Sequence, residues 1–232
     1  MTTVRHSIRI LAIFLLTGCA KDAFTRGELP KLSSPSSTDI RETFANQQPD
    51  TFVAENAFVI HAPFRDDFAF LGVVQVDRAA GTFEFVGLSQ TGVQYFHVSG
   101  GADGNHLRDA IGPLMKQKRI LLSFAEDIRR MYLNLVPGDN AKANVKSRFV
   151  RFAEKTSAGK VIRDFGGEPI VLLEKRMKGF LRTKWRARYF DYATADGKTY
   201  PRGILVKNGK YFYRITVKNR NWEAIEASAT MD

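Results

Sequence analysis

The chain has 232 residues, a formal net charge of +11 and a hydrophobic fraction of 44%. That length is sufficient for one sizeable domain with a substantial core. The composition includes a single cysteine, which excludes a disulfide within the chain, so the fold must depend on burial and hydrogen bonding.

The first residues have the layout of a bacterial lipoprotein signal. Arg5 and Arg9 give a basic start, an apolar run extends to Leu16, and small residues precede Cys19. A basic start with a short apolar core is typical of a secretory signal rather than a membrane-spanning helix. Cleavage would leave Cys19 as the first mature residue, acylated and held on the membrane by two or three chains. A cytosolic start with a buried cysteine is the alternative.

The signal predicts the compartment and the partners. Removal of Arg5 and Arg9 with the signal lowers the net charge from +11 to +9. No aspartate follows Cys19 directly, where enterobacterial sorting reads an inner-membrane retention signal, so we expect lipid anchoring to the outer membrane, facing the periplasm. A basic protein on a membrane attracts anionic head groups, whereas export argues against nucleic acid as a partner.

The composition changes along the chain predict three segments. Residues 1–18 are the signal peptide, residues 19–50 form the lipidated N-terminus, a Ser/Pro-rich tether and a short helix, and residues 51–232 form the folded domain. Asp39 and Glu42 have capping-box spacing, which predicts a short helix ending near Gln47.

Alternating apolar residues predict an antiparallel meander at the start of the domain. Its strands begin at Phe58 and continue over 67–77, 82–88 and 93–99, joined by short turns. A glycine-rich turn over 99–105 follows them.

Helical spacing then replaces the alternation. We expect an irregular helix or helix-turn over 106–118 and an amphipathic helix from Ser123, capped with Glu126, to Leu135. The following Pro137-Gly138 ends this helix.

A second series of strands completes the chain. They are predicted over 146–154, 160–164, 169–176, 183–192, 202–207 and 210–219. Asn208-Gly209 predicts a two-residue hairpin turn between the last two, of the type that requires positive φ. An antiparallel sheet with helices in the middle is an α+β arrangement.

Short motifs in this order resemble one family. The helix over 123–135 is followed by Val136-Pro137-Gly138-Asp139, which resembles the lid helix and the Pro-Gly-Asp turn of LolB. Residues 185–192 resemble a core strand of the same family, and residues 201–206 with 213–217 resemble its closing hairpin. Over residues 55–222 the chain is similar to the LolA/LolB-like family, closest to the uncharacterised LolB-like outer-membrane lipoproteins.

The resemblance implies a fold and a function. The fold is a strongly curved antiparallel sheet, an unclosed half-barrel, with helices covering its mouth and a cavity that takes acyl chains. LolB receives lipoproteins from a soluble periplasmic partner and delivers them to the outer membrane. LolB has an exposed apolar residue in the loop after its third strand, but the corresponding loop here, Ser89–Gly92, is polar, so lipoprotein insertion does not follow from the resemblance.

Two groups of residues are candidate sites. Aromatic and apolar side chains on the strands and the lid helix would line a cavity for a lipophilic ligand, and plain core packing is the alternative; they are Phe68, Phe70, Phe83, Phe85, Phe124, Ile128, Tyr132, Trp185 and Tyr189. Period-two spacing places Arg182, Lys184, Arg186 and Arg188 on one strand face, where they would dock on an anionic surface or remain a solvated outer face. Phe180 and Leu181, in the loop before them, would touch the membrane.

The sequence contains little that supports a catalytic function. His61, His97 and His106 lack metal-ligand spacing, and the only cysteine is the expected lipidation site. We therefore expect no enzyme activity, no cofactor and no metal. Two functions remain: a carrier that shields a lipophilic ligand for lipid or lipoprotein transfer, or an anchored scaffold that binds an envelope protein partner.

Overall fold

The computed structural model describes residues 24–32, 36–63, 66–157, 159–180 and 182–225. The predicted signal peptide, Cys19 and Leu181 lie outside these residues. The elements in chain order are α1 (Ser37–Asn46), β1 (Thr51–His61), β2 (Phe68–Asp77), β3 (Thr82–Leu88), β4 (Gln94–Gly101), β5 (Gly104–Ala110), α2 (Gly112–Met115), α3 (Lys118–Tyr132), β6 (Lys142–Val145), β7 (Val150–Thr156), β8 (Gly159–Gly166), β9 (Val171–Lys178), β10 (Thr183–Ala195), β11 (Lys198–Asn208) and β12 (Tyr213–Ile225).

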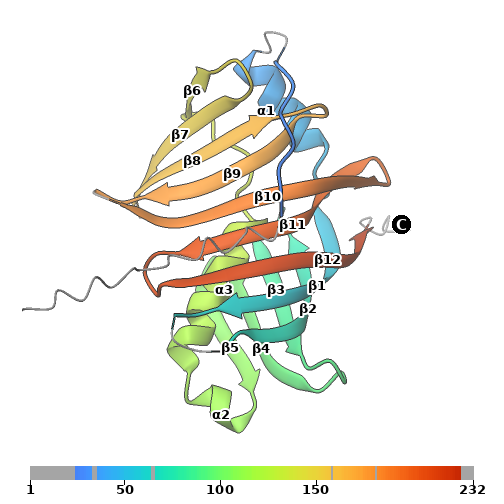
Figure 1. Ribbon diagram of the computed structural model, residues 1–232, viewed down its shortest axis with the longest axis vertical. Helices are drawn as coiled ribbons and strands as arrows, with labels where there is room; N and C mark the ends of the chain where they lie inside the picture. The colour runs from blue at the N-terminus through green and yellow to red at the C-terminus, as the bar shows by residue number, and fades with distance from the viewer. Residues whose placement is uncertain (1–23, 33–35, 64–65, 158, 181, 226–232) are drawn as a thin grey trace, which may run out of the picture.

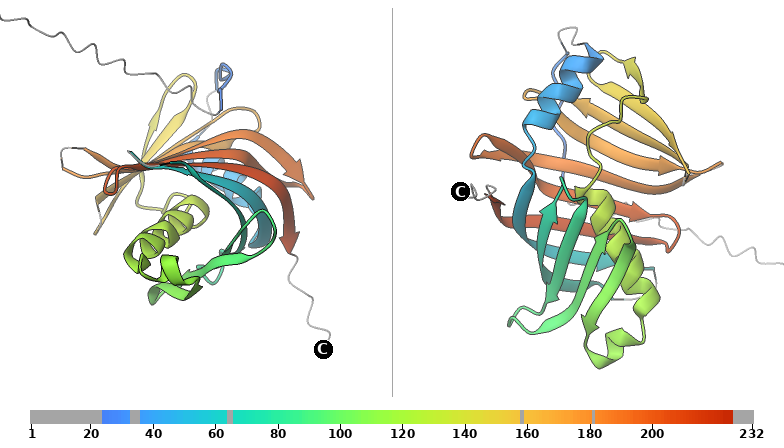
Figure 2. Two further views of the ribbon diagram at one scale, coloured as in Figure 1. Left: turned by 60° about the horizontal axis from the view of Figure 1, so that its bottom comes forward. Right: turned by 180° about the vertical axis from the view of Figure 1, so that it is seen from behind.

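All twelve strands form one sheet in the order β5-β4-β3-β2-β1-β12-β11-β10-β9-β8-β7-β6. Every neighbouring pair for which register is defined is antiparallel, and β12 returns to pair with β1, which joins the two meanders. The sheet bends around α3 without closing, while α1 covers the other half of the same side (Figures 1 and 2). The predicted α+β half-barrel with helices over its mouth is confirmed.

The segment before α1 lies along the outer face of the sheet. Phe24 stacks on Phe190 with ring centroids 5.3 Å apart, and Arg26 donates to the backbone carbonyls of Leu173 and Tyr189. Part of the segment predicted as a tether is therefore packed against the domain.

Helix α1 forms where the sequence predicts it. Its N-cap is Ser36, whose hydroxyl accepts from the Asp39 backbone N–H, so Asp39 lies in the first turn instead of capping the helix. Ile40 and Phe44 are buried, and Phe44 packs edge-on against Phe165 of β8. The helix thus contributes to the domain core.

The helix or helix-turn predicted over 106–118 is wrong for its first half, because Gly104–Ala110 is the edge strand β5, and only the single turn α2 is helical there. The main helix α3 runs over Lys118–Tyr132, so it begins before the predicted cap at Ser123 and ends before Leu135 and Pro137. An edge strand needs little apolar surface because much of it faces solvent, and the polar residues of β5 therefore hid its alternation. None of the helices in the described part of the chain is long and apolar enough to cross a membrane.

Several strand boundaries also differ from prediction. The single strand predicted over 146–154 is instead a hairpin of β6 and β7, with a loop over 146–149. β1 begins at Thr51 rather than Phe58, because its polar inward residue Asn56 interrupts the apolar alternation of Phe52, Ala54 and Phe58. Asn208 pairs with Tyr213, which leaves a four-residue loop, and the left-handed residue is Phe212 rather than Gly209. The Asn208 side chain accepts from the backbone N–H groups of Lys210 and Tyr211, and this stabilises the wider loop.

Candidate ligand-binding site

Aromatic rings fill the interior beneath the N-terminal half of α3. Phe124 of α3 meets four strand phenylalanines with ring centroids 5.1 to 5.8 Å apart; these are Phe58, Phe70, Phe85 and Phe96. All five are at most 3% exposed. Three of the predicted cavity residues, Phe70, Phe85 and Phe124, are therefore brought together, but they contact one another rather than a hollow.

Glycines on the strands let these rings lie flat against the sheet. A Cβ at Gly72 would approach the Phe85 ring to 2.5 Å, and one at Gly87 would approach the Phe96 ring to 2.6 Å. Phe83 covers Gly100 in the same way. The rings occupy the space where side chains would otherwise stand, and this is how close-packed interiors are built.

The remaining predicted residues of this half differ in burial. Ile128 is fully buried on α3, whereas Phe68 is 39% exposed and stands at the rim, 5.2 Å from Phe70 and 5.7 Å from Tyr95. Phe68 is thus the exposed edge of the aromatic interior.

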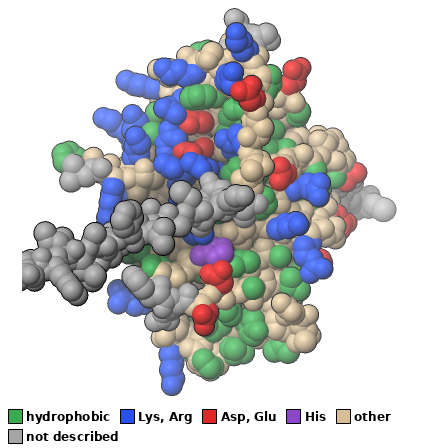
Figure 3. Space-filling view, in the orientation of Figure 1, with side chains coloured by type: hydrophobic (Ala, Val, Ile, Leu, Met, Phe, Trp, Pro, Cys, Tyr) green, Lys and Arg blue, Asp and Glu red, His purple; other side chains and the backbone are tan. Residues whose placement is uncertain are grey.

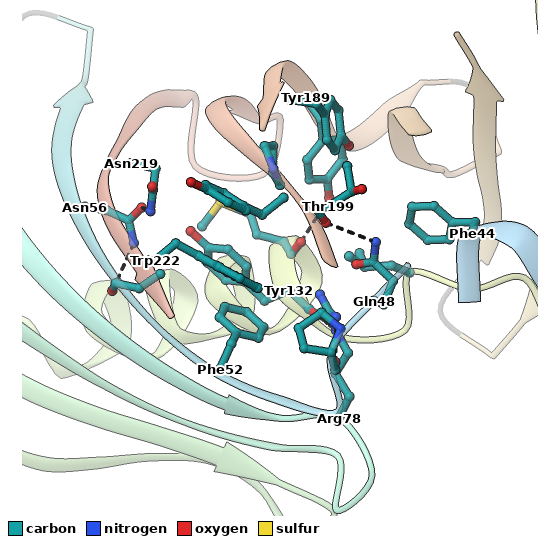
Figure 4. A pocket seen from close by; sticks show the side chains of 17 residues that line it. Phe44, Gln48, Phe52, Asn56, Arg78, Tyr132, Tyr189, Thr199, Asn219 and Trp222 are labelled. Atoms are coloured by element: carbon teal, nitrogen blue, oxygen red, sulfur yellow. Dashed lines mark hydrogen bonds between the residues drawn. The ribbon is translucent and has the colours of Figure 1, made fainter. Parts of the chain in front are cut away.

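A small cavity lies beyond the end of α3, between α1, β1 and the β10–β12 strands (Figure 4). Phe52, Tyr132, Tyr189 and Trp222 point into it, and its volume is about 30 Å³. That volume suits about one water molecule and cannot hold an acyl chain. Tyr132 and Tyr189 therefore lie together as predicted, around a space that is nearly filled.

Cationic side chains of the sheet hold the C-terminal end of α3. Lys175 of β9 donates to the carbonyls of Arg130 (2.9 Å) and Leu133 (2.8 Å), and Arg163 of β8 donates to the carbonyl of Asn134. Positive charge at a helix C-terminus is stabilising because the carbonyl ends carry partial negative charge. Burial nevertheless holds the pKa of the Lys175 ammonium well below its ordinary value.

A buried carboxylate links α3 to the β11–β12 hairpin. Asp127 is 0% exposed. Each of its two carboxylate oxygens accepts a hydrogen bond from Asn208 Nδ2 at 3.1 Å, and one of them also accepts from the Tyr213 hydroxyl. Burial raises the pKa of Asp127 to about 6, although these hydrogen bonds act in the opposite direction.

An open groove of about 460 Å³ runs beside the C-terminal half of α3, against β7–β10. Leu133, Met177 and Trp185, which belong to the hydrophobic core, form its floor. Arg129, Arg130 and Arg163 stand among its lining residues with the carboxylates Glu126 and Glu154, which already pair with them. This volume lies within the range of ligand pockets.

Of the predicted cavity residues, Trp185 alone lines this groove. The cations Arg163 and Lys175 were not predicted as inward-facing. A signal was available, because period two places Arg163 on the same face as Val161 and Phe165, and Lys175 on the same face as Met177.

The predicted docking cations lie on β10 and in the loop before it. Arg186 and Arg188 approach Glu174 at 3.5 and 3.2 Å, within a network that continues through Arg176 and Asp164. Arg182 and Lys184 are exposed near the start of β10. Lys and Arg side chains gather over the β7–β10 part of this face (Figure 3).

Comparison with known proteins shows similarity only in structure. No family model and no curated protein matches the sequence. A LolA superfamily protein from Nitrosomonas europaea superposes with a TM-score of 0.56 at 8% identity, covering 84% of this chain and 96% of that one. The chain has the fold of that LolA superfamily protein. The resemblance inferred from the sequence is therefore confirmed for the fold.

Two further structures are similar at lower scores. A DUF1329 family protein from Desulfovibrio piger has a TM-score of 0.48 at 11% identity, covering 86% of this chain and 96% of its own. An outer membrane lipoprotein-sorting protein domain from Vibrio parahaemolyticus has a TM-score of 0.40 at 8% identity, covering 84% and 93%.

Proposed function

We propose that the protein is a non-enzymatic carrier of the cell envelope that binds the apolar chain of an amphiphile in the groove beside α3. The observation that carries this proposal is the groove itself, an open space of about 460 Å³ with a floor of core residues and arginines beside it. An apolar chain on that floor leaves water, and this drives binding without polar contacts. The arginines would then face an anionic head group.

The shared fold supports the same role. The sheet bends around α3 without closing (Figure 2), so a chain can enter beside the helix, and the groove is lined by residues of α3 and of β7–β10. The aromatic interior is closed, so we expect the ligand to occupy the groove first and to reach further only if α3 moves.

Anchoring through an acylated Cys19 on the outer membrane completes the proposal, and the basic protein would then work close to lipid. Intact mass spectrometry of the membrane-expressed protein should show loss of residues 1–18 and addition of acyl chains at Cys19. An unmodified mass would contradict the anchor and leave the groove unaffected.

The groove is tested by lipid extraction and by binding of a fluorescent fatty acid. Val161 lines the groove, and Val161→Glu places a carboxylate on its wall, so we expect binding to fall at least tenfold. Val93→Glu is the matched control, because Val93 is 58% exposed elsewhere. Equal binding by both variants would contradict the groove as the site.

The packed interior favours a second candidate, an anchored scaffold for an envelope protein partner. The ring contacts of Phe124 leave no room for a ligand in the interior beneath α3, and the cavity beyond the end of α3 holds only about 30 Å³. A protein that purifies without lipid and also fails to take up a fluorescent fatty acid would favour the scaffold.

A further inference from the structure

Three hairpin loops meet at one end of the sheet, and we refer to the described residues of 155–160, 178–184 and 207–214, which exclude 158 and 181, as the hairpin tip. The loops are tied together. Lys160 stands directly opposite Lys178 across β8 and β9, and the Gly209 N–H donates to the Lys184 carbonyl at 2.9 Å. The Arg182 guanidinium lies 6.0 Å from the centre of the Phe212 ring. The tip is therefore one surface built from segments far apart in sequence.

Large aromatic side chains project from this tip into solvent. Phe180 is 100% exposed, Phe212 66% and Tyr211 38%. Single exposed apolar residues are ordinary, but bulky rings at the ends of two adjacent hairpins form a group. Phe180 protrudes from the end of its loop, and Phe212 borders a wide, open hollow with His61 and Tyr213 but keeps two thirds of its surface in solvent. Both rings are therefore free to enter a partner that they can penetrate.

The charges of the tip are of one sign. The three segments contain eight Lys or Arg residues and no Asp or Glu. Lys155 stands opposite Lys160, Lys160 opposite Lys178, and Lys207 opposite Arg214. Like charges directly opposite each other destabilise a sheet, so these pairs do not serve its stability.

Acidic side chains lie beside the tip and at the opposite end of the sheet. In the adjacent β1–β2 loop Asp67 pairs with His61 at 2.8 Å. At the opposite end of the sheet the loops after β8 and β10 expose Glu168 and Asp196, and no large hydrophobic residue of these two loops is exposed. Exposed aromatic rings therefore coincide at this end of the sheet with a group of cations whose segments contain no acidic residue.

We propose that the hairpin tip docks on a bilayer that contains anionic lipids. Phe180 and Phe212 enter the head-group region, where amphipathic and aromatic side chains are favoured, and the surrounding lysines and arginines contact the lipid phosphates. An acidic protein would match the charge, but it would need a complementary pocket for each protruding ring. This surface is separate from the groove beside α3, and it does not depend on acylation of Cys19.

A fluorophore placed at the tip reports docking locally. The full chain with Cys19→Ser carries one introduced cysteine, at Phe180→Cys or Phe212→Cys, labelled with an environment-sensitive dye. We expect a blue shift and quenching by lipid-attached quenchers on vesicles of phosphatidylcholine with phosphatidylglycerol, and little change on phosphatidylcholine alone. Asp196→Cys at the opposite end is the control and should remain in a water-like environment. All three positions are exposed, so labelling leaves the core intact.

Charge removal tests the second half of the proposal. Neutralising three tip lysines should lower the preference for anionic over neutral vesicles by roughly fivefold per lysine, about a hundredfold in total; the variant is Lys155→Gln, Lys160→Gln, Lys178→Gln. The matched control removes the same charge from exposed positions away from the tip, as Arg202→Gln, Lys218→Gln, Arg220→Gln.

Three outcomes would overturn the proposal. They are an unshifted dye at positions 180 and 212 on anionic vesicles, an equal shift at position 196, and equal losses of vesicle binding in the two charge variants. A dye that shifts with an acidic peptide but not with vesicles would assign the tip to a protein partner, and would also overturn it.

Discussion

The two halves of the molecule hold the same helix in different ways. In the ring lobe, β1–β5 with the N-terminal half of α3, phenylalanines fill all the space beneath the helix. In the charged lobe, β6–β10 with the C-terminal end of α3, Lys175 binds a carbonyl of the last helical turn and Arg163 binds the carbonyl of Asn134 just after it, beside an open groove. Phenylalanine rings can pack without gaps because they need no hydrogen-bond partner. A buried charged side chain must instead reach a polar partner, so its position is set by that partner and not by close packing. The ring lobe thus provides stability, and the charged lobe leaves volume for a ligand.

The largest expected effect is in the ring lobe. Phe85→Ala removes a fully buried ring that contacts Phe58, Phe96 and Phe124, so the free energy of unfolding should fall by about 3–5 kcal/mol in chemical denaturation. Phe212→Ala removes an exposed ring and should change it by less than about 0.5 kcal/mol. A loss below about 1 kcal/mol for Phe85→Ala would mean that the ring lobe is loosely packed.

A smaller effect is expected from pH at the contact between α3 and the β11–β12 hairpin. Because burial raises the pKa of Asp127 from 3.8 to about 6, the folded state favours the protonated carboxyl. Its stability contribution is full below pH 3.8 and is lost as the pH rises through about 6. At about 1.4 kcal/mol per pKa unit, the loss is about 3 kcal/mol.

Asp127→Asn removes this titration. As the pH rises from 3.8 to about 6, the free energy of unfolding of the parent should therefore fall by about 3 kcal/mol relative to that of this variant. A constant difference across that range would show that the carboxylate is solvated or otherwise paired, and that α3 is less firmly seated than the hydrogen bonds of Asn208 and Tyr213 indicate.

The smallest effect concerns one hydrogen bond to the end of α3. Tyr189→Phe keeps the buried ring but removes the hydroxyl that donates to the Met131 carbonyl at 3.1 Å, so stability should fall by about 1 kcal/mol. Tyr211→Phe, at an exposed ring, is the control and should have no measurable effect. A loss as large as that of Phe85→Ala would remove the contrast between the two lobes.

The sequence predicted most strands because alternation is a local signal. Thr82–Leu88 places Phe83 and Phe85 on one face, and the strand forms over those same residues. β5 was missed because an edge strand can be polar, and the start of β1 was missed because Asn56 faces inward. For the candidate site, the sequence identified rings that do gather beneath α3, but it placed them around a hollow that they themselves fill.

What the sequence by itself determined is most of the strands, the central position of the main helix, the α+β class and the one-sided charge of individual segments, because these depend on residues close together in the chain. Only the tertiary structure decided that β12 pairs with β1, that Lys175 points at the carbonyls of α3, and that three hairpin loops form one basic and aromatic tip. These features join residues far apart in the chain, and their spacing in sequence carries no signal of the distances between them. The packing of rings is of the same kind, because whether an interior is hollow or solid depends on how far the sheet bends around its helix.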